Sequence, residues 1–199
     1  MMDNSRVVNT YPLSSYHFYI KDQKTEKNYS VRARLSRLRL NYSIEGMKRS
    51  VEGVLLVQEH NFPYVLVFKI GDTLHKLPGG KLRPGEDEIE GLKRKLSSKF
   101  ARNNPEHQQN WQIRECLGIW WRPNFDNVLY PYCDSHIQPK ECTKIYLVQL
   151  SAGESLGVPE NFKLLAVPLF ELHDNGKYGR VLSSIPRQLS TFRFNHISP

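Results

Sequence analysis

The sequence of 199 residues lacks the features of a membrane-spanning or secreted protein. No apolar run approaches the ~20 residues that a helix needs to cross a bilayer. The charged and aromatic first 24 residues also lack the basic-then-apolar order of a signal peptide. These absences predict a soluble, intracellular protein.

Cysteine is scarce, with only Cys116, Cys133 and Cys142. Their odd number and their spacings fit neither a disulfide framework nor a CxxC metal site, so we expect three free thiols. The seven histidines show no HxH or HxxxH pair. The sequence therefore predicts no metal centre and no bound cofactor.

Acidic residues are too few to balance the basic ones, since 20 Asp and Glu stand against 28 Lys and Arg and the formal charge is +8. Residues 21–50 alone hold nine basic and three acidic side chains. This excess favours an anionic partner such as nucleic acid, a nucleotide or an acidic lipid. Val31, Leu35 and Leu38 recur there at helical spacing, so the same charges also fit the solvated face of a helix, and both interpretations stay open.

Hydrophobic patterning predicts a mixed α/β protein. Runs rich in β-branched residues at 51–58 and 64–70 predict two central strands joined by a short loop at 59–63, and further strands are expected at 113–121, 144–150 and 164–168. With 11% aromatic residues the chain can build a sizeable core. We therefore expect one domain over 49–199, preceded by an N-terminal extension and basic helix over 1–48.

Two helices are expected after the central strands. Ile89, Leu92, Leu96 and Phe100 form one apolar stripe, with acidic residues at its start and basic residues at its end, which predicts a helix over 87–100. A second apolar stripe predicts a helix over 181–192 that Pro186 kinks or restarts.

The segment before and within the first of these helices resembles a Nudix box, G-x5-E-x7-R-E-U-x-E-E-x-G-U, where U is apolar. Gly80, Glu86 and Arg94 have the spacing of that pattern. In a Nudix hydrolase, glutamates on this helix hold magnesium against a pyrophosphate. The later carboxylate positions are occupied here by Lys95, Ser98 and Lys99. Because ammonium groups repel Mg²⁺, we expect the fold without the hydrolysis.

Longer strings give a more specific resemblance. They are NTYPL at 9–13, SVEGVLLVQEH at 50–60, KLPGG at 76–80, GEDEIEGLKR at 85–94, WWRPNF at 120–125, YPY at 130–132 and PLFEL at 168–172. Together they resemble the small, Nudix-fold subunit of pre-mRNA cleavage factor I, from about Val8 to Asn195. The resemblance implies a Nudix fold in which helices sandwich a mixed sheet.

The same resemblance implies a nuclear RNA-binding homodimer that recognises UGUA elements upstream of polyadenylation sites, hydrolyses nothing and pairs with a larger RRM-containing subunit. The base-contacting positions that it implies are Glu26, Arg34, Glu52, Thr73, Leu74, His75, Leu77, Tyr178 and Gly179. The positions that it implies for the larger partner are Arg122, Tyr130 and Tyr132. Carboxylates, an arginine fork and main-chain groups are suited to reading the edges of unpaired bases.

Alternatives to this interpretation remain at the level of sequence. The protein could bind or slowly hydrolyse dinucleoside polyphosphates at the incomplete box, or could be a scaffold without RNA binding. Glu52 could form an ion pair with Arg49 on a solvated face. The chain also departs from the family at Leu74, where an aromatic residue is usual, and at Arg180, where the family usually has proline. Affinity for RNA is therefore expected to differ from that of other members.

Overall fold

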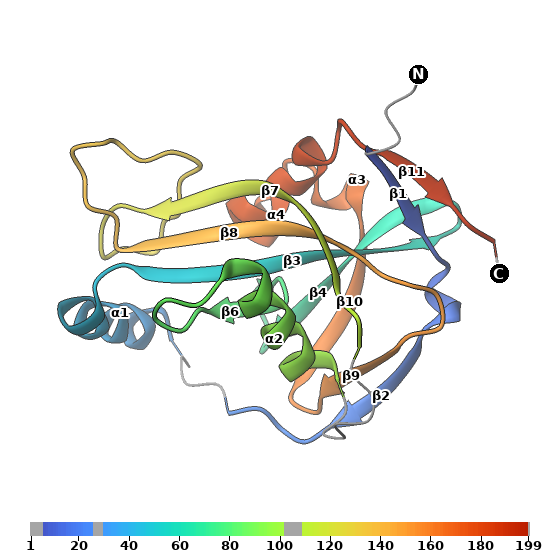
Figure 1. Ribbon diagram of the computed structural model, residues 1–199, viewed down its shortest axis with the longest axis horizontal. Coiled ribbons are helices and arrows are strands. Elements are labelled where there is room, and N and C mark those ends of the chain that lie inside the picture. The colour runs from blue at the N-terminus through green and yellow to red at the C-terminus, as the bar shows by residue number, and fades with distance from the viewer. Residues whose placement is uncertain (1–5, 26–29, 102–108, 199) are drawn as a thin grey trace.

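The computed structural model describes residues 6–25, 30–101 and 109–198 (Figure 1). Its helices are α1 (Val31–Glu45), α2 (Glu88–Phe100), α3 (Leu169–Leu172) and α4 (Gly179–Gln188), with short 3-10 turns η2 (Leu13–Ser15) and η3 (Gly176–Tyr178). Its strands are β1 (Val7–Thr10), β2 (His17–Lys21), β3 (Lys48–Glu59), β4 (Phe62–Ile70), β5 (Leu74–Lys76), β6 (Gly79–Lys81), β7 (Gln112–Arg122), β8 (Glu141–Gln149), β9 (Ser155–Pro159), β10 (Phe162–Pro168) and β11 (Arg193–His196). No helix in these ranges is long and apolar enough to cross a membrane.

The central sheet is mixed, with strand order β10-β4-β3-β8-β7. The β3 and β8 strands run parallel and the other neighbours on this path run antiparallel. The β3 and β4 strands are joined through His60 and Asn61, whose φ angles of 51° and 62° suit a two-residue hairpin turn. Beyond Leu56 and Val65 the two strands separate, and β5 pairs with β4 while β6 pairs with β3.

Alternation along the central strands creates a hydrophobic core on each face of the sheet. Val51, Leu55 and Val57 pack in the same cluster as the apolar stripe of α2. Val54 and Leu56 point to the other face and pack in the cluster that contains the buried residues of α3 and α4. Helices thus cover both faces, which confirms the expected mixed sheet sandwiched between helices (Figure 1).

The helices expected over 87–100 and 181–192 are present as α2 and α4, but their ends differ from the expected ones. The Asp87 side chain caps α2 by accepting hydrogen bonds from the N–H groups of Ile89 and Glu90, at 3.0 and 3.1 Å. Pro186 lies inside α4, which ends at Gln188 rather than at 192 because the chain then turns to place β11 beside β1. In α1, Ser30 caps the start and only Leu38 is buried, so most of this helix is solvated.

The first 48 residues are tied to the rest of the molecule by non-local strand pairs. The β1 strand pairs in parallel with β11, and β2 pairs in parallel with β9. Periodicity did not indicate these short strands, nor β5 and β6. A boundary at residue 48 stays a prediction, although β1 and β2 share their sheets with the last third of the chain.

Candidate functional site

The segment that resembles a Nudix box contains one glutamate at a position of that pattern, Glu86, and this glutamate forms an ion pair with Arg94. Glu86 accepts two hydrogen bonds from the guanidinium of Arg94, at 2.6 and 2.7 Å, and one from the N–H of Arg83 at 2.8 Å. The Arg94 and Arg83 donors hold the pKa of Glu86 at about 2. This carboxylate is therefore committed to closing the loop onto α2.

The three substituted positions are also engaged. The Lys95 side chain lies over Gly80, since a Cβ atom on that glycine would stand 3.3 Å from Lys95 Cδ. Ser98 Oγ is 3.1 Å from the Lys24 ammonium, and Lys99 Nζ lies 5.4 Å from the centre of the Phe162 ring. In the described ranges no group of three or more His, Cys, Asp or Glu could hold a metal ion. This surface offers a divalent cation nothing comparable to a carboxylate cluster.

A second region begins at β5. The rings of His75 and Tyr178 meet edge-on with centroids 4.8 Å apart. Tyr178 is buried and its hydroxyl donates to Glu171, so burial and that carboxylate raise the pKa of Tyr178 to about 12. Burial and the charges of Lys177 and Lys69 lower the pKa of His75 and so favour its neutral ring.

Contacts extend this region across the 123–140 loop to α1. Next to Tyr178, Gly179 is exposed with φ +81°, and the Arg180 guanidinium lies 5.3 Å from the centre of the Tyr130 ring. The main chain of Tyr130 pairs with that of Trp121 in both directions, at 2.7 and 2.8 Å. Three residues earlier in the same loop, the side-chain amide oxygen of Asn127 accepts a hydrogen bond from the Arg34 guanidinium. Segments around residues 34, 75, 130 and 179 are thereby linked.

Glu52 is an unusual acid in the middle of β3. Strand alternation places it on the same face as Val54, Leu56 and the second core cluster. It is half-buried, and within the described ranges its carboxylate has neither a hydrogen bond nor an ion pair. Burial raises the pKa of Glu52 to about 7, even though Lys76 opposes the rise. The alternative ion pair with Arg49 is wrong, because Arg49 binds Glu88 at 3.2 Å.

Two of the expected site residues are buried, and for Arg122 the expectation needs correction. Leu77 is 1% exposed and packs in the second core cluster, so only its main chain could meet a base. Arg122 is 5% exposed rather than presented to a partner. It binds Glu141 at 2.8 Å and donates to the Asp126 carbonyl at 2.5 Å, which anchors the 123–140 loop.

The remaining assignments lie at the surface or outside the described residues. Thr73 is exposed, and Leu74 is 41% exposed on the opposite side of β5 from His75. Tyr132 is 69% exposed and its ring lies 5.9 Å from that of Tyr130. Glu26 lies outside the described residues.

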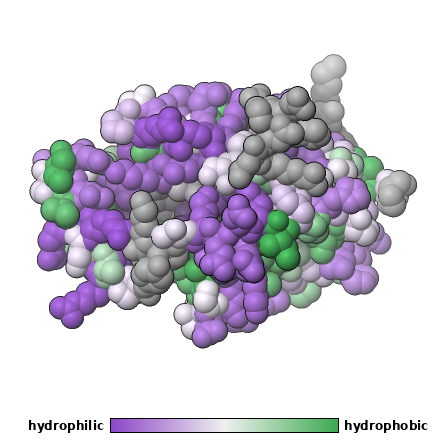
Figure 2. Space-filling model, turned by 90° about the horizontal axis from the view of Figure 1, so that it is seen from below, coloured by the Kyte–Doolittle hydropathy of each residue, from purple (hydrophilic) through white to green (hydrophobic). Residues whose placement is uncertain are grey.

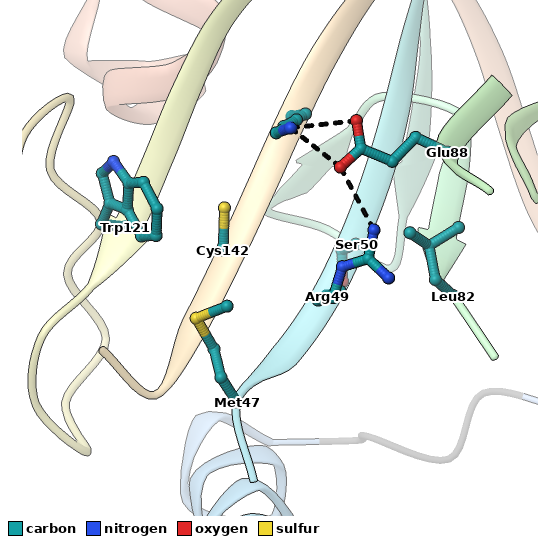
Figure 3. Close-up of a pocket in the computed structure, with 8 residues that line it drawn as sticks. Met47, Arg49, Ser50, Leu82, Glu88, Trp121 and Cys142 are labelled. Carbon is teal, nitrogen blue, oxygen red and sulfur yellow. Dashed lines mark hydrogen bonds and ion pairs between the residues drawn. The ribbon is translucent and has the colours of Figure 1, made fainter. Parts of the chain in front are cut away.

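Sequence reasoning missed a polar network at the start of α2 (Figure 3). Glu88 binds Lys144 at 2.8 Å and Arg49, and accepts from the Tyr146 hydroxyl at 2.6 Å. Burial opposes ionisation, but these donors lower the pKa of Glu88. The adjoining pocket, lined also by Trp121 and Cys142, has about 170 Å³ and is smaller than the ~300 Å³ of ordinary ligand sites. We infer that this network stabilises the fold and does not bind a ligand.

Comparisons with known proteins agree with the expected family. A Nudix family model, described as a nucleotide hydrolase, matches residues 6–192. The chain is 57% identical to pre-mRNA cleavage factor Im 25 kDa subunit 2 of Arabidopsis thaliana, over 99% of this chain and 100% of that protein. It is 48% identical to subunit 1 of the same plant, over 95% of this chain and 86% of that protein. It is 38% identical to cleavage and polyadenylation specificity factor subunit 5 of Dictyostelium discoideum, over 97% and 98%.

Proposed function

The chain belongs to the Nudix-fold family of pre-mRNA cleavage factor Im 25 kDa subunits, and we propose that it is a non-catalytic, RNA-binding member that reads UGUA elements. The names of its relatives support a role in pre-mRNA 3′-end processing. We propose further that it works in the nucleus as a homodimer, together with a larger RRM-containing subunit.

One observation carries the RNA-binding proposal. The chain folds so that three distant segments with assigned base-contacting residues, around Arg34, His75 and Tyr178, are linked through the 123–140 loop. The links are the contacts of Arg34 with Asn127, of Arg180 with Tyr130 and of His75 with Tyr178. A continuous surface built from distant segments is what a short, unpaired RNA strand needs. Had these residues lain on separate faces, the assignment would have lost its physical basis.

The chemistry of the residues assigned to RNA suits base edges. The Glu52 carboxylate has no protein partner among the described residues, so it is available to the N–H groups of guanine or uracil. Arg34 can offer its guanidinium donors to base carbonyls, with Asn127 holding the side chain in place. The main chain of residues 73–77 supplies further donors and acceptors where β5 leaves the sheet.

Hydrolysis of nucleotides is not supported as a second function. Catalysis by a Nudix box requires carboxylates that hold metal ions and activate water. Here Glu86 is bound to Arg94, and lysines or serine occupy the other positions. We therefore propose that the fold is used for binding alone.

The exposed tyrosine ring of Tyr132, with Tyr130 beside it, is proposed as the contact for the larger subunit. Tyrosines are enriched among residues that anchor protein interfaces. Arg122 is assigned an indirect role, since its buried ion pair with Glu141 holds the loop that presents both rings.

The test is binding of a UGUA-containing oligonucleotide, compared with a permuted UGAU sequence, by fluorescence anisotropy at several salt concentrations. We expect Arg34→Gln to weaken UGUA binding by about tenfold and to remove the preference for UGUA, since it removes charged hydrogen-bond donors. The matched control is Arg32→Gln on the exposed side of the same helix, which should reduce binding of both RNAs slightly and equally. Equal binding of UGUA and UGAU by the unaltered protein would refute the proposal.

A further inference from the structure

Arg180 is an exposed basic residue in the first turn of α4. It follows Gly179 directly, and Gly179 is one of the residues assigned to base contact. The resemblance to the family implies proline at position 180, so the guanidinium is a feature of this chain that the resemblance does not explain.

General polarity does not mark a path for RNA over this molecule. The face seen in Figure 2 is mostly hydrophilic, and apolar residues form separate spots on it. Arg180 is distinguished instead by its fixed position beside Gly179.

One contact holds the Arg180 side chain in place. Its guanidinium lies 5.3 Å from the centre of the Tyr130 ring, which is within the range of a cation–π contact. The Tyr130 main chain is fixed in turn by its two hydrogen bonds with Trp121. A cation–π contact leaves the N–H donors of the guanidinium without an oxygen acceptor, so they stay available to a ligand.

No acidic side chain offsets the charge of Arg180 in the described part of the chain. Within residues 6–25, 30–101 and 109–198 its guanidinium forms neither an ion pair nor a hydrogen bond. Arg122 shows the contrast, because its buried guanidinium binds Glu141 at 2.8 Å. The donors of Arg122 are used by the fold, whereas those of Arg180 face solvent.

Lys177 provides a second cation on the other side of the same short stretch. Its exposed ammonium lies 5.2 Å from the centre of the Tyr178 ring. Tyr178 and Gly179 therefore stand in the chain between two cations, each held against an aromatic ring. A nucleotide whose base meets this stretch carries a phosphate on each side, where such cations can bind it.

We propose that Arg180 binds a phosphate of the RNA backbone next to the nucleotide that meets Gly179. This inference rests on the proposed function, since the assigned base contacts define where the RNA lies. The planar fork of a guanidinium matches two phosphate oxygens and makes charge-assisted hydrogen bonds with them. Phosphate contacts position the strand and do not read its sequence, so Arg180 adds affinity without adding preference.

The same contact offsets part of the stacking that Leu74 does not supply. An aromatic ring at that position would stack on a base, and such stacking depends little on salt. A contact between a guanidinium and a phosphate weakens as salt rises, because its strength includes the release of counterions. RNA binding by this chain therefore depends on salt partly through Arg180.

The test compares binding of the UGUA and UGAU oligonucleotides by fluorescence anisotropy over a range of salt concentrations. Arg180→Gln should weaken both by one common factor, about threefold to tenfold at low salt. It should also reduce the slope of log affinity against log salt by about 0.7, the value for one phosphate contact on a single strand. Arg180→Lys should restore the slope because it restores the charge. Arg187→Gln, exposed further along α4, is the matched control and should change neither quantity.

Neutral linkages locate the phosphate on the RNA. Each phosphate of the UGUA oligonucleotide is replaced in turn by an uncharged methylphosphonate. We expect one linkage at which Arg180→Gln no longer weakens binding, because the contact is already lost. Such non-additivity between a change in the protein and a change in the RNA identifies a direct contact.

The proposal is overturned if Arg180→Gln leaves the salt slope unchanged, or if every neutral linkage simply adds to its effect. It is also overturned if the preference for UGUA over UGAU changes, since the guanidinium would then meet a base. Thermal melting shows whether each variant keeps its fold. If Arg180→Gln melts early, Arg180→Pro carries the same test, because proline is tolerated in the first turn of a helix.

Failure of this proposal is distinguishable from failure of UGUA recognition. Equal binding of UGUA and UGAU by the unaltered protein refutes UGUA recognition, while the salt slopes of the Arg180 and Arg187 variants still test the phosphate contact. A slope that does not respond to Arg180, together with a clear preference for UGUA, refutes the phosphate contact alone. Absence of RNA binding by the unaltered protein refutes both.

Discussion

The carboxylates of Glu86 and Glu52 lie in two regions of this molecule and differ in their hydrogen-bond partners and in the direction of their pKa shifts. Glu86 accepts hydrogen bonds from Arg94 and Arg83 and has a pKa of about 2. Glu52 is half-buried without a partner in the described part of the chain, and its pKa is about 7. A carboxylate whose acceptors are filled serves the fold, whereas one that is desolvated without compensation is suited to a ligand that supplies the missing donors.

The difference indicates where function lies in this member of the fold. The helix that carries metal ligands in Nudix hydrolases has become a structural and basic element here. The proposed reading surface lies instead around β5, η3 and the 123–140 loop. The lysines and serine on α2 and the unpartnered carboxylate on β3 both fit the proposed use of this fold for recognition.

The largest effect is expected at Glu141, a third glutamate that is both buried and paired. It binds Arg122 at 2.8 Å and Lys48 at 2.9 Å, so Glu141→Ala leaves a buried guanidinium without its carboxylate partner. We expect a loss of about 3–5 kcal/mol in the free energy of unfolding, measured with urea. Glu90→Ala, which breaks only the exposed pair with Lys93, is the control and should cost less than ~1 kcal/mol. Equal losses in the two variants would show that the buried pair does not hold the loop.

The next largest effect is expected for RNA binding at Glu52. Glu52→Gln replaces the carboxylate with a neutral amide, so UGUA affinity should fall by about 1.5–3 kcal/mol, or roughly ten- to a hundredfold. The unaltered protein should also bind UGUA more tightly at about pH 8 than at about pH 6.5, because the carboxylate ionises through its raised pKa. The variant should lose that pH dependence. Glu59→Gln, at the exposed end of the same strand, should change neither quantity.

The stability of Glu52→Gln separates this effect from misfolding. Because the folded-state pKa of Glu52 lies above the unfolded value of 4.5, ionisation of this one group lowers the free energy of unfolding as the pH rises from 4.5 toward 7 and has no such effect below pH 4.5. Glu52→Gln should remove this fall and should melt at or above the temperature of the unaltered protein at pH 8. A lower melting temperature there would mean that Glu52 serves the fold, as Glu86 does.

Much of this architecture was predictable, because long elements carry a clear period. The α2 helix shows an apolar stripe and a charge gradient, and β3 and β4 show dense β-branched runs. Three-residue strands such as β5 and β6 are too short for a period, and the pairs of β1 with β11 and β2 with β9 join segments far apart in sequence. Such pairing depends on tertiary contacts that no local pattern encodes.

The environment of the site was less predictable than its residues. Burial of Arg122 follows from Trp120 sharing its face of β7, a period-two signal that sequence reasoning did not use. Its partner Glu141 lies 19 residues further along, beyond the loop that it anchors. The absence of an ion pair between Glu52 and Arg49 follows from strand alternation, which places Arg49 on the opposite face of β3, where it binds Glu88; sequence reasoning did not use this signal.

A smaller effect on RNA affinity is expected at Leu74, the position where the resemblance to the family implies an aromatic residue. Leu74 is 41% exposed, so a ring there can face an unpaired base, and Leu74→Phe should tighten UGUA binding by about 0.5–1.5 kcal/mol. The opposite orientation of His75 and its contact with Tyr178 make it a poor substitute for that platform. Leu74→Ala is the control for lost apolar contact. If phenylalanine and alanine behave alike, residues 73–77 do not form the stacking surface.

The smallest effect is expected for substitution of Glu86, which should leave UGUA affinity unchanged. If this carboxylate serves only to bind Arg94, Glu86→Gln should lower the melting temperature slightly, because the amide still accepts one hydrogen bond, and should leave UGUA affinity unaltered. Neither protein should release phosphate from nucleoside diphosphate derivatives or dinucleoside polyphosphates with Mg²⁺ or Mn²⁺, since one occupied glutamate cannot replace a carboxylate cluster. Arg94→Gln provides the matching change on the other side of the pair and should reproduce the loss of stability. Turnover above background that disappears in Glu86→Gln would contradict the assignment of Glu86 to the fold. It would show that the paired carboxylate of Glu86 takes part in catalysis.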